Sequence, residues 1–385
     1  MDNFTFYNPA RIHFGKGQIA ELANEIPANQ RVLITYGSGS IKRNGVLDEV
    51  KSALAEHQVF EFGGIEANPH YETLLSALDI IKAENIDFLL AVGGGSVIDG
   101  TKFLAAAAKY TGDSWGIIES RGATVKDALP MGCVLTLAAT GSEMNNCSVI
   151  TKQSTQDKLF FFNDLVIPRF SILDPATNFS LPRRQSANGV VDAFVHIVEQ
   201  YVTYPVDAKV QDAIAEGLLK VLITEGPKIL DNPEDYNARA NIMWSATMAL
   251  NGILRVGVPG DWASHMIGQE ITALHGLDHA QTLAVMLPAV WKYKKQDKLD
   301  KLVQYAANVW GISGNDHSDI ADRAIAATQT FFEQMGVPTR LADYGLDEAI
   351  IPEILVKLEE HSHVGLGERG DIGLADAEQI LRLAK

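Results

Sequence analysis

Four side chains of the kind that bind metal ions stand out in the second half of the sequence: Asp192, His196, His265 and His279. Asp192 and His196 lie in a stretch with helical periodicity, where a spacing of four residues places both on one face, one turn apart. Three imidazoles and one carboxylate suit Zn²⁺ or Fe²⁺ and do not suit Cu(I) or an iron–sulfur cluster. A metal held in this way can act as a Lewis acid on a substrate oxygen.

Spacing alone leaves other interpretations of these residues open. An Asp-x-x-x-His pair is commonly a surface salt bridge or a helix cap, and a single interior histidine is commonly a hydrogen-bonded core residue. His275 also competes with His279 for the fourth position, because both belong to the segment His275-Gly-Leu-Asp-His279.

The bulk composition indicates a two-domain protein with an acidic surface. The chain has 385 residues, of which 46% are hydrophobic, so it can bury a large core and exceeds the usual size of one domain. A formal net charge of −16 repels nucleic acid and anionic membranes, which argues against both as partners. An anionic cofactor would therefore have to bind through local backbone amides and a few cations.

The cysteines and the N-terminus bear on the expected compartment. The two cysteines, Cys133 and Cys147, form no Cys-x-x-Cys pair, and a reducing compartment is the simplest inference. The first residues lack the basic and apolar regions of a signal peptide, and no apolar run is long enough to span a bilayer. These features predict a soluble, cytoplasmic protein.

Hydrophobic patterns divide the chain near residue 180. Before it, strand patterns at 31–36, 59–62 and 88–92 alternate with helical patterns, which predicts a parallel sheet covered by helices. After it, helical patterns dominate, at 190–202, 207–223, 238–254, 320–335 and 350–360. We therefore expect an α/β domain over residues 1–180 and an all-α domain over residues 181–385.

A glycine-rich turn in the first domain is the candidate phosphate site. The segment Gly93-Gly94-Gly95-Ser96-Val97-Ile98-Asp99 joins a predicted strand to a predicted helix. Glycines there let the backbone approach a diphosphate, and the helix N-terminus supplies unpaired N–H groups. The usual Gly-x-Gly-x-x-Gly fingerprint is absent, and a tight turn without a ligand is the alternative.

The end of the first predicted strand bears on the choice of cofactor. An acidic residue at such a position binds the ribose 2′-hydroxyl of NAD and repels a 2′-phosphate. This chain instead has Gly37-Ser38-Gly39-Ser40, followed by Lys42 and Arg43, which favours NADP(H). The alternative is that Lys42 and Arg43 are solvated surface charges.

Several motifs together resemble the iron-containing (group III, metal-dependent) alcohol dehydrogenases over essentially the whole chain. They are Pro9-x-x-Ile12-x-Phe14-Gly15-Lys16-Gly17, Asn68-Pro69, the Gly93–Asp99 turn, Thr140-Gly141-Ser142-Glu143, Asp174-Pro175, Gly189-x-x-Asp192-x-x-x-His196-x-x-Glu199, His265 and His279. The resemblance implies a Rossmann-like dinucleotide-binding domain followed by an all-α domain, as in dehydroquinate synthase. It also implies a homodimer.

The resemblance implies roles for particular residues. Asp192, His196, His265 and His279 correspond to the positions that bind the family's divalent metal, Zn or Fe, and they are the expected catalytic centre. The implied NADP(H) contacts are Gly37, Ser38, Ser40, Asn68, Gly94, Gly95, Ser96, Asp99, Thr136, Thr140, Asn145 and Lys158. One departure is Gln269, where many members have a histidine that can carry a proton near neutral pH.

These expectations amount to an NADPH-dependent aldehyde reductase that also works in reverse on primary alcohols. The substrate is expected to be a small aldehyde or alcohol. A sugar-phosphate cyclase-type lyase on the same scaffold is the first alternative, although few cations surround the metal motifs. A non-catalytic NADP-binding homologue is the second, suggested by Gln269.

Overall fold

The computed structural model describes residues 1–385, which form two compact units. The first, here called the sheet unit, contains Tyr7–Leu181 and Pro233–Thr247. The second, the helical unit, contains Met1–Phe6, Pro182–Asn232 and Met248–Lys385. Each unit is thus built from separate stretches of chain. The assignment of cofactor binding to one and metal binding to the other remains a prediction.

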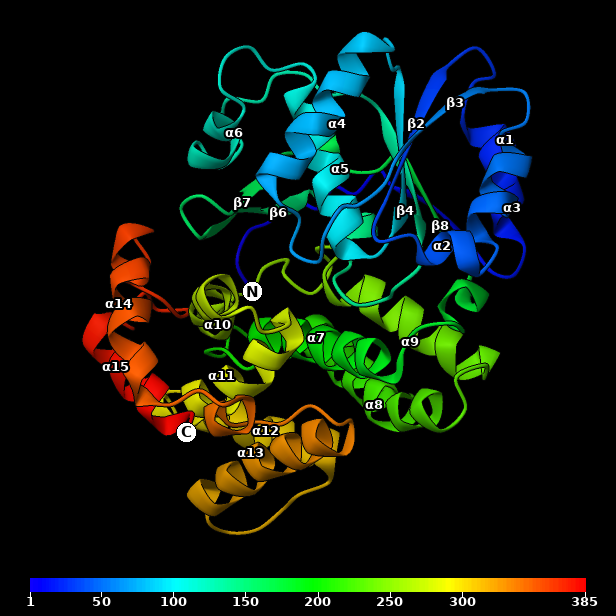
Figure 1. Ribbon diagram of the computed structural model, residues 1–385. Coiled ribbons are helices and arrows are strands. Elements are labelled where there is room, and N and C mark those ends of the chain that lie inside the picture. Colours follow the sequence, from blue (N-terminus) through cyan, green and yellow to red (C-terminus); the bar gives the residue numbers. More distant parts are fainter. The chain divides into compact units, whose positions relative to one another are not determined.

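A six-stranded parallel sheet forms the centre of the sheet unit (Figure 1). Its strand order is β1-β8-β5-β4-β2-β3, and a separate antiparallel hairpin pairs β6 with β7. The strands are β1 (Arg11–Phe14), β2 (Arg31–Tyr36), β3 (Gln58–Phe62), β4 (Phe88–Gly93), β5 (Met131–Leu135), β6 (Cys147–Lys152), β7 (Asp157–Phe162) and β8 (Phe170–Leu173).

Helices cover both faces of this sheet, because its inner strands are apolar on both sides. Alternate residues such as Val32, Ile34 and Tyr36 belong to one hydrophobic cluster with the helices of the first 54 residues. Thr35, between Ile34 and Tyr36, points to the other face of the sheet, where its Oγ1 lies 2.6 Å from Oγ1 of Thr101. The helices of this unit are α1 (Leu22–Glu25), α2 (Ser40–Arg43), α3 (Val46–Ala53), α4 (Tyr71–Ala83), α5 (Gly95–Ala107) and α6 (Trp115–Glu119).

The strand order creates a switch point between β2 and β4. From β2 the chain moves outward to β3, and then returns to β4 on the opposite side of β2 before continuing to β5. In open parallel sheets, ligands bind beyond the carboxyl ends of the strands at such a point. The loops that follow β2 and β4 begin at Gly37 and Gly94, which are the glycine-rich segments singled out in the sequence.

The helical unit contains no strand, as the sequence predicts. Its helices are α7 (Arg183–Tyr201), α8 (Lys209–Asp231), α10 (Ala263–His275), α11 (His279–Tyr293), α12 (Leu299–Tyr305), α13 (His317–Gln334), α14 (Ile351–Glu360) and α15 (Leu374–Leu383). One more helix, α9 (Tyr236–Ala249), lies mostly within the sheet unit. The predicted fold class, a parallel α/β sheet followed by an all-α region, is confirmed. None of the helices is long and apolar enough to cross a membrane.

Candidate metal centre and cofactor site

Three helices of the helical unit bring the four metal-binding candidates together. Asp192 and His196 lie one turn apart on α7, His265 is in the first turn of α10, and His279 is the first residue of α11. One ligand atom from each of the four lies within 4.8 Å of the others. Residues separated by up to 87 positions in the sequence thus converge. The spacing of residues within a single helix could not predict this convergence.

The separations within this cluster fit a shared divalent ion. Oδ1 of Asp192 lies 3.8 Å from Nδ1 of His196 and 3.8 Å from Nε2 of His279. These gaps exceed a hydrogen bond and match two ligands that each sit about 2.0–2.2 Å from one ion. The ring centroids of His196 and His265 are 4.8 Å apart. The residues present therefore fit the metal that the sequence predicts.

Burial favours the neutral form of His196, the form that binds a cation. Burial, and to a smaller extent the positive charge that His265 would carry, lower the pKa of His196 to about 4, although the carboxylate of Asp192 opposes this shift. A neutral imidazole is the form that binds a metal. Nδ1 of His196 is buried without a hydrogen-bond partner, as expected for an atom whose natural partner is an ion.

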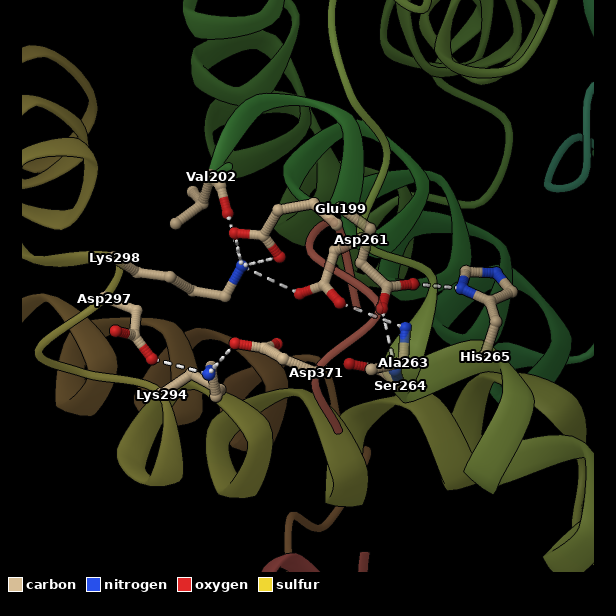
Figure 2. Close-up of polar contacts among 11 residues, drawn as sticks. Glu199, Val202, Asp261, Ala263, Ser264, His265, Lys294, Asp297, Lys298 and Asp371 are labelled. Carbon is tan, nitrogen blue, oxygen red and sulfur yellow. Dashed lines mark hydrogen bonds and ion pairs between the residues drawn. The ribbon is translucent and has the colours of Figure 1, made fainter. Parts of the chain in front are cut away.

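Glu199 orients the ring of His265 (Figure 2). Nδ1 of His265 donates to one carboxylate oxygen of Glu199, and the backbone N–H of Ser264 donates to the other at 2.8 Å. With Nδ1 engaged in this way, Nε2 is the ring nitrogen of His265 that would bind a metal, as in the usual carboxylate–histidine–metal arrangement. Burial raises the pKa of Glu199 to about 7, against the hydrogen bonds from Ser264, which lower it.

A buried lysine holds the loop that leads into α10. Nζ of Lys298 lies 3.0 Å from Oδ2 of Asp261 and 2.7 Å from both carboxylate oxygens of Glu368, as Figure 2 shows in part. The backbone N–H of Asp261 donates to the carbonyl of Glu199 at 2.8 Å. Burial lowers the pKa of Lys298, but the two carboxylates outweigh it and raise the pKa above its usual value. Sequence reasoning missed this cluster, since its members are far apart in the chain.

The start of α10 is conformationally unusual. Trp262 precedes the helix with φ of 60°, a left-handed conformation that a bulky residue rarely adopts. Its ring meets that of His265 edge-on, with centroids 5.3 Å apart. A Cβ at Gly260 would lie 2.3 Å from Nε1 of Trp262, so this approach requires glycine. Strained backbone of this kind tends to occur next to functional groups.

His275 and Gln269 lie on the same helix but outside the cluster of four. Nε2 of His275 lies 3.1 Å from Oε1 of Glu353 on α14, so His279 and not His275 joins the other three candidates. Gln269 follows His265 by one turn and is buried, and its Oε1 has no hydrogen-bond partner. An amide at this position cannot exchange a proton near neutral pH.

The predicted cofactor residues all lie in the sheet unit, and many adjoin the turn after β4. A Cβ at Gly94 would lie 2.9 Å from Cβ of Leu137, and one at Gly95 would lie 2.4 Å from Oγ1 of Thr140. Glycine is therefore required where the turn meets the loop after β5. The N–H of Thr136 donates to the carbonyl of Gly93 at 3.0 Å, which joins the two loops. Gly95 begins α5, whose first N–H groups suit a diphosphate.

Other cofactor candidates are joined by hydrogen bonds around α5. The N–H of Asn68, which has φ of 58°, donates to Oγ of Ser96 at 3.2 Å. Oγ of Ser142 donates to Asp99 at 2.5 Å. Burial raises the pKa of Asp99 against the lowering effects of Lys102 and Lys158.

Lys102 is a buried residue that sequence reasoning missed. Its side chain is fully buried, and its Nζ donates to Oγ of Ser142, Oδ1 of Asn145 and the carbonyl of Cys147 at 2.8–2.9 Å. Burial lowers its pKa, while Asp99 raises it. Lys102 follows Asp99 by three positions on α5, and this spacing is the signal that could have identified it. Asn145 is thus held in place by a lysine.

The loop after β2 has exposed hydroxyl groups and a lysine, Lys42, that lies close to a carboxylate and an aromatic ring. Ser38 and Ser40 are exposed. Nζ of Lys42 lies 4.8 Å from the ring centroid of Tyr36 and 3.7 Å from Oε2 of Glu61. Hydrogen bonding to Tyr36 and the charge of Glu61 raise the pKa of Lys42. Lys42 is therefore cationic and close to the loop, although part of its charge is neutralised by a carboxylate on β3.

Comparison with known proteins identifies relatives over the full length of the chain. The family model for iron-containing alcohol dehydrogenases matches residues 9–175, and the model for the C-terminal part of the Fe-containing alcohol dehydrogenase family matches residues 186–369. The NADPH-dependent aldehyde reductase YqhD of Escherichia coli is 57% identical over 387 residues, covering 100% of both chains. A probable NADH-dependent butanol dehydrogenase of Bacillus subtilis is 41% identical, covering 99% of both.

Solved structures agree with these matches. The crystal structure of E. coli YqhD superposes with a TM-score of 0.99 at 57% identity, covering 100% of this chain and 99% of that one. An NADH-dependent butanol dehydrogenase from Thermotoga maritima gives 0.95 at 35% identity, with the same coverage.

Proposed function

The chain belongs to the iron-containing alcohol dehydrogenase family, and from that premise we propose that it is an NADPH-dependent aldehyde reductase, reversible with primary alcohols. The observation that carries this proposal is the convergence of Asp192, His196, His265 and His279 within 4.8 Å. When bound there, a divalent ion, Zn²⁺ or Fe²⁺, supplies a Lewis acid for a carbonyl, and NADPH supplies the hydride.

The chain's own residues hold and orient this centre. Asp192 and His196 are fixed relative to each other by one turn of α7, and Glu199 on the same helix holds the ring of His265. Ligands locked in this way need little rearrangement when substrate binds, which favours a fast reaction. Gln269 cannot release a proton near neutral pH, so we propose that water or a hydroxyl group supplies the proton of the alcohol product.

The loops after β2, β4 and β5 support the assignment of NADP(H). The residues proposed to contact the diphosphate and nearby ribose are Gly94, Gly95, Ser96 and Asp99. Those proposed for the adenosine ribose and its 2′-phosphate are Gly37, Ser38 and Ser40, with Asn68 nearby, and Thr136, Thr140, Asn145 and Lys158 are proposed as further contacts. The segment from Gly37 to Ser40 has small residues, exposed hydroxyls on Ser38 and Ser40 and no carboxylate, which favours a 2′-phosphate. The relatives include both NADPH- and NADH-dependent enzymes, so the proposed choice of NADPH over NADH rests on this loop.

The proposal also covers the roles of the two domains, the cellular compartment and the oligomeric state. We assign NADP(H) binding to residues 1–180 and metal binding to residues 181–385, and we propose a cytoplasmic homodimer. Neither Cys133 nor Cys147 forms a disulfide, which is consistent with a reducing compartment. Light scattering of the purified protein would test the dimer, and a monomer in solution would contradict it.

Steady-state kinetics test the proposed reaction. We expect oxidation of NADPH in the presence of small aldehydes, a higher kcat/KM with NADPH than with NADH, and reduction of NADP⁺ when a primary alcohol replaces the aldehyde. Metal-loaded protein that turns over none of these would contradict the proposal. Elimination of phosphate from a sugar phosphate without net change in the cofactor would instead indicate a lyase.

A further inference from the structure

A second group of ligand-type side chains lies elsewhere in the helical unit. Glu270 is on α10, His361 directly follows α14, and His363 is two residues further on. Nδ1 of His361 lies 2.8 Å from Oε1 of Glu270, and Nδ1 of His363 lies 3.6 Å from the same oxygen. One ligand atom from each of the three lies within 4.8 Å of the others. This group shares no residue with the centre described above.

The end of α14 is shaped to present both histidines to one carboxylate. The N–H of His361 donates to the carbonyl of Lys357 at 3.0 Å, and the N–H of His363 donates back to Leu358 at 2.7 Å. Between them, Ser362 has φ of 60°, an uncommon conformation for a residue other than glycine. This turn brings the two imidazoles, two residues apart in sequence, to the same side chain on α10.

The three side chains are almost fully buried. The exposed fractions of the side chains are 0% for Glu270, 7% for His361 and 6% for His363. The carboxylate of Glu270 therefore has almost no contact with water. A buried anion is stable only with a cation beside it.

Hydrogen bonding within the protein does not account for all of these polar atoms. The pair formed by Glu270 and His361 uses Oε1 of the glutamate. The other oxygen, Oε2, is buried without a hydrogen-bond partner, and so are both ring nitrogens of His363. An imidazole buried in this way is unusual, because native structures satisfy nearly all buried polar atoms. A ligand that accepts lone pairs from a carboxylate and from neutral imidazoles would satisfy them.

We propose that Glu270, His361 and His363 form a second metal site, which binds a divalent transition-metal ion such as Zn²⁺. Two imidazoles and one carboxylate are a zinc ligand set, and water can complete the coordination. The ion would fasten the end of α14 to α10, the helix whose first turn carries His265. Its role is structural, and it does not depend on the function proposed above.

Metal counting in four proteins tests this site. Each protein is stripped with a chelator, equilibrated with Zn²⁺ and freed of unbound ion, and bound zinc per chain is then measured by mass spectrometry. We expect two ions in the unmodified protein, one in Asp192→Ala, one in His363→Leu and none in the double variant. His275→Ala is the matched control, since it removes another histidine between the same two helices and should keep both ions.

The pattern of losses separates this proposal from the first metal site. A single ion in the unmodified protein that disappears in Asp192→Ala would overturn the second site. Loss of one ion in His363→Leu but none in Asp192→Ala would support the second site and contradict the first.

A thermal measurement covers the case in which His363→Leu fails to fold. In Asp192→Ala protein, added Zn²⁺ should raise Tm with rising zinc concentration, because a ligand that binds only the native state stabilises it. The milder variant His361→Gln in the same background should abolish this shift. No zinc-dependent shift in Asp192→Ala would overturn the proposal.

Discussion

The carboxylate of Asp192 lies 3.8 Å from a nitrogen of each of two imidazoles, so it is central to the proposed catalytic site. We predict that Asp192→Ala loses the ion held there and reduces turnover by at least about a hundredfold, because three neutral imidazoles bind a dication more weakly. Metal content and kcat measured on the same preparation check this. Full occupancy of that site with a near-normal rate would refute the assignment.

Histidine 275 provides the control for Asp192→Ala. It pairs with the half-exposed Glu353, and exposed pairs contribute little to stability, at most about 1 kcal/mol. His275→Ala should therefore keep both its metal and its rate. A loss of metal in this variant would mean that His275, and not His279, completes the site.

Gln269 lies one turn after His265 on α10 and cannot exchange a proton near neutral pH. We predict that Gln269→His changes the pH–rate profile and leaves the metal content unaltered, because a histidine one turn from His265 adds a group that titrates near neutral pH. General acid catalysis contributes typically about a hundredfold or more, so a proton-limited step would show a clear change in kcat. An unchanged profile would mean that the proton travels by another route.

Ser38 tests the choice of cofactor. The side chain is exposed just beyond β2, where a carboxylate would repel a 2′-phosphate. We predict that Ser38→Asp reverses the preference from NADPH to NADH, mainly through a higher KM for NADPH. Kinetics with both cofactors measure this, and Thr124→Asp on an unrelated exposed loop serves as the control. Unaltered NADPH kinetics would show that Ser38 does not face the 2′ position.

At the scale of residues, the sequence predicts side chains that belong to recognisable motifs and misses those that support them. Asp192 and His196 could be found because one helix turn separates them. Glu199 lies three residues after His196, on the same helix face, and belongs to the same motif. Its role in orienting His265 depends on a contact with α10 that the spacing within α7 does not reveal. Glu270, His361 and His363 carry no motif, and only the packing of α10 against the end of α14 brings them together.

At the scale of elements, Glu199 links α7 to the first turn of α10. We predict that Glu199→Gln lowers metal affinity about 10–100-fold, because an amide oxygen holds His265 less firmly than a carboxylate. A competitive zinc titration measures the affinity directly. Glu225→Gln, which alters an ion pair with the exposed Lys228 on α8, is the matched control. Equal affinities in the two variants would contradict a positioning role for Glu199.

Elements with strong periodicity were predictable and others were not. Residues 31–36 were predicted as a strand, and β2 spans the same residues, because an apolar β-branched run ends there at Gly37. The edge strand β1 and its neighbour β8 have four residues each, too few to establish a pattern. The helix predicted over 207–223 was too short at its C-terminal end, because α8 continues through Pro227 to Asp231. Packing overrides the helix-breaking tendency of that proline.

At the scale of the whole molecule, composition indicated two domains but could not show how the chain is shared between them. Pro233–Thr247 belongs to the sheet unit although it follows α7 and α8, and Met1–Phe6 belongs to the helical unit. In the helical unit, the N–H of Asp2 donates to the carbonyl of Gly257 at 3.0 Å. Such long-range pairings have no local signature, so periodicity can find elements without revealing which unit holds them.

The rate of aldehyde-dependent NADPH oxidation, measured on metal-free protein as Zn²⁺ or Fe²⁺ is added back, tests the central claim most directly. We expect no measurable rate without metal, and recovery of the rate as the site formed by Asp192, His196, His265 and His279 fills. Recovery should be absent in Asp192→Ala and present in His363→Leu. A full rate in metal-free protein, or equal recovery in Asp192→Ala, would show that a metal at this site is not needed for aldehyde reduction.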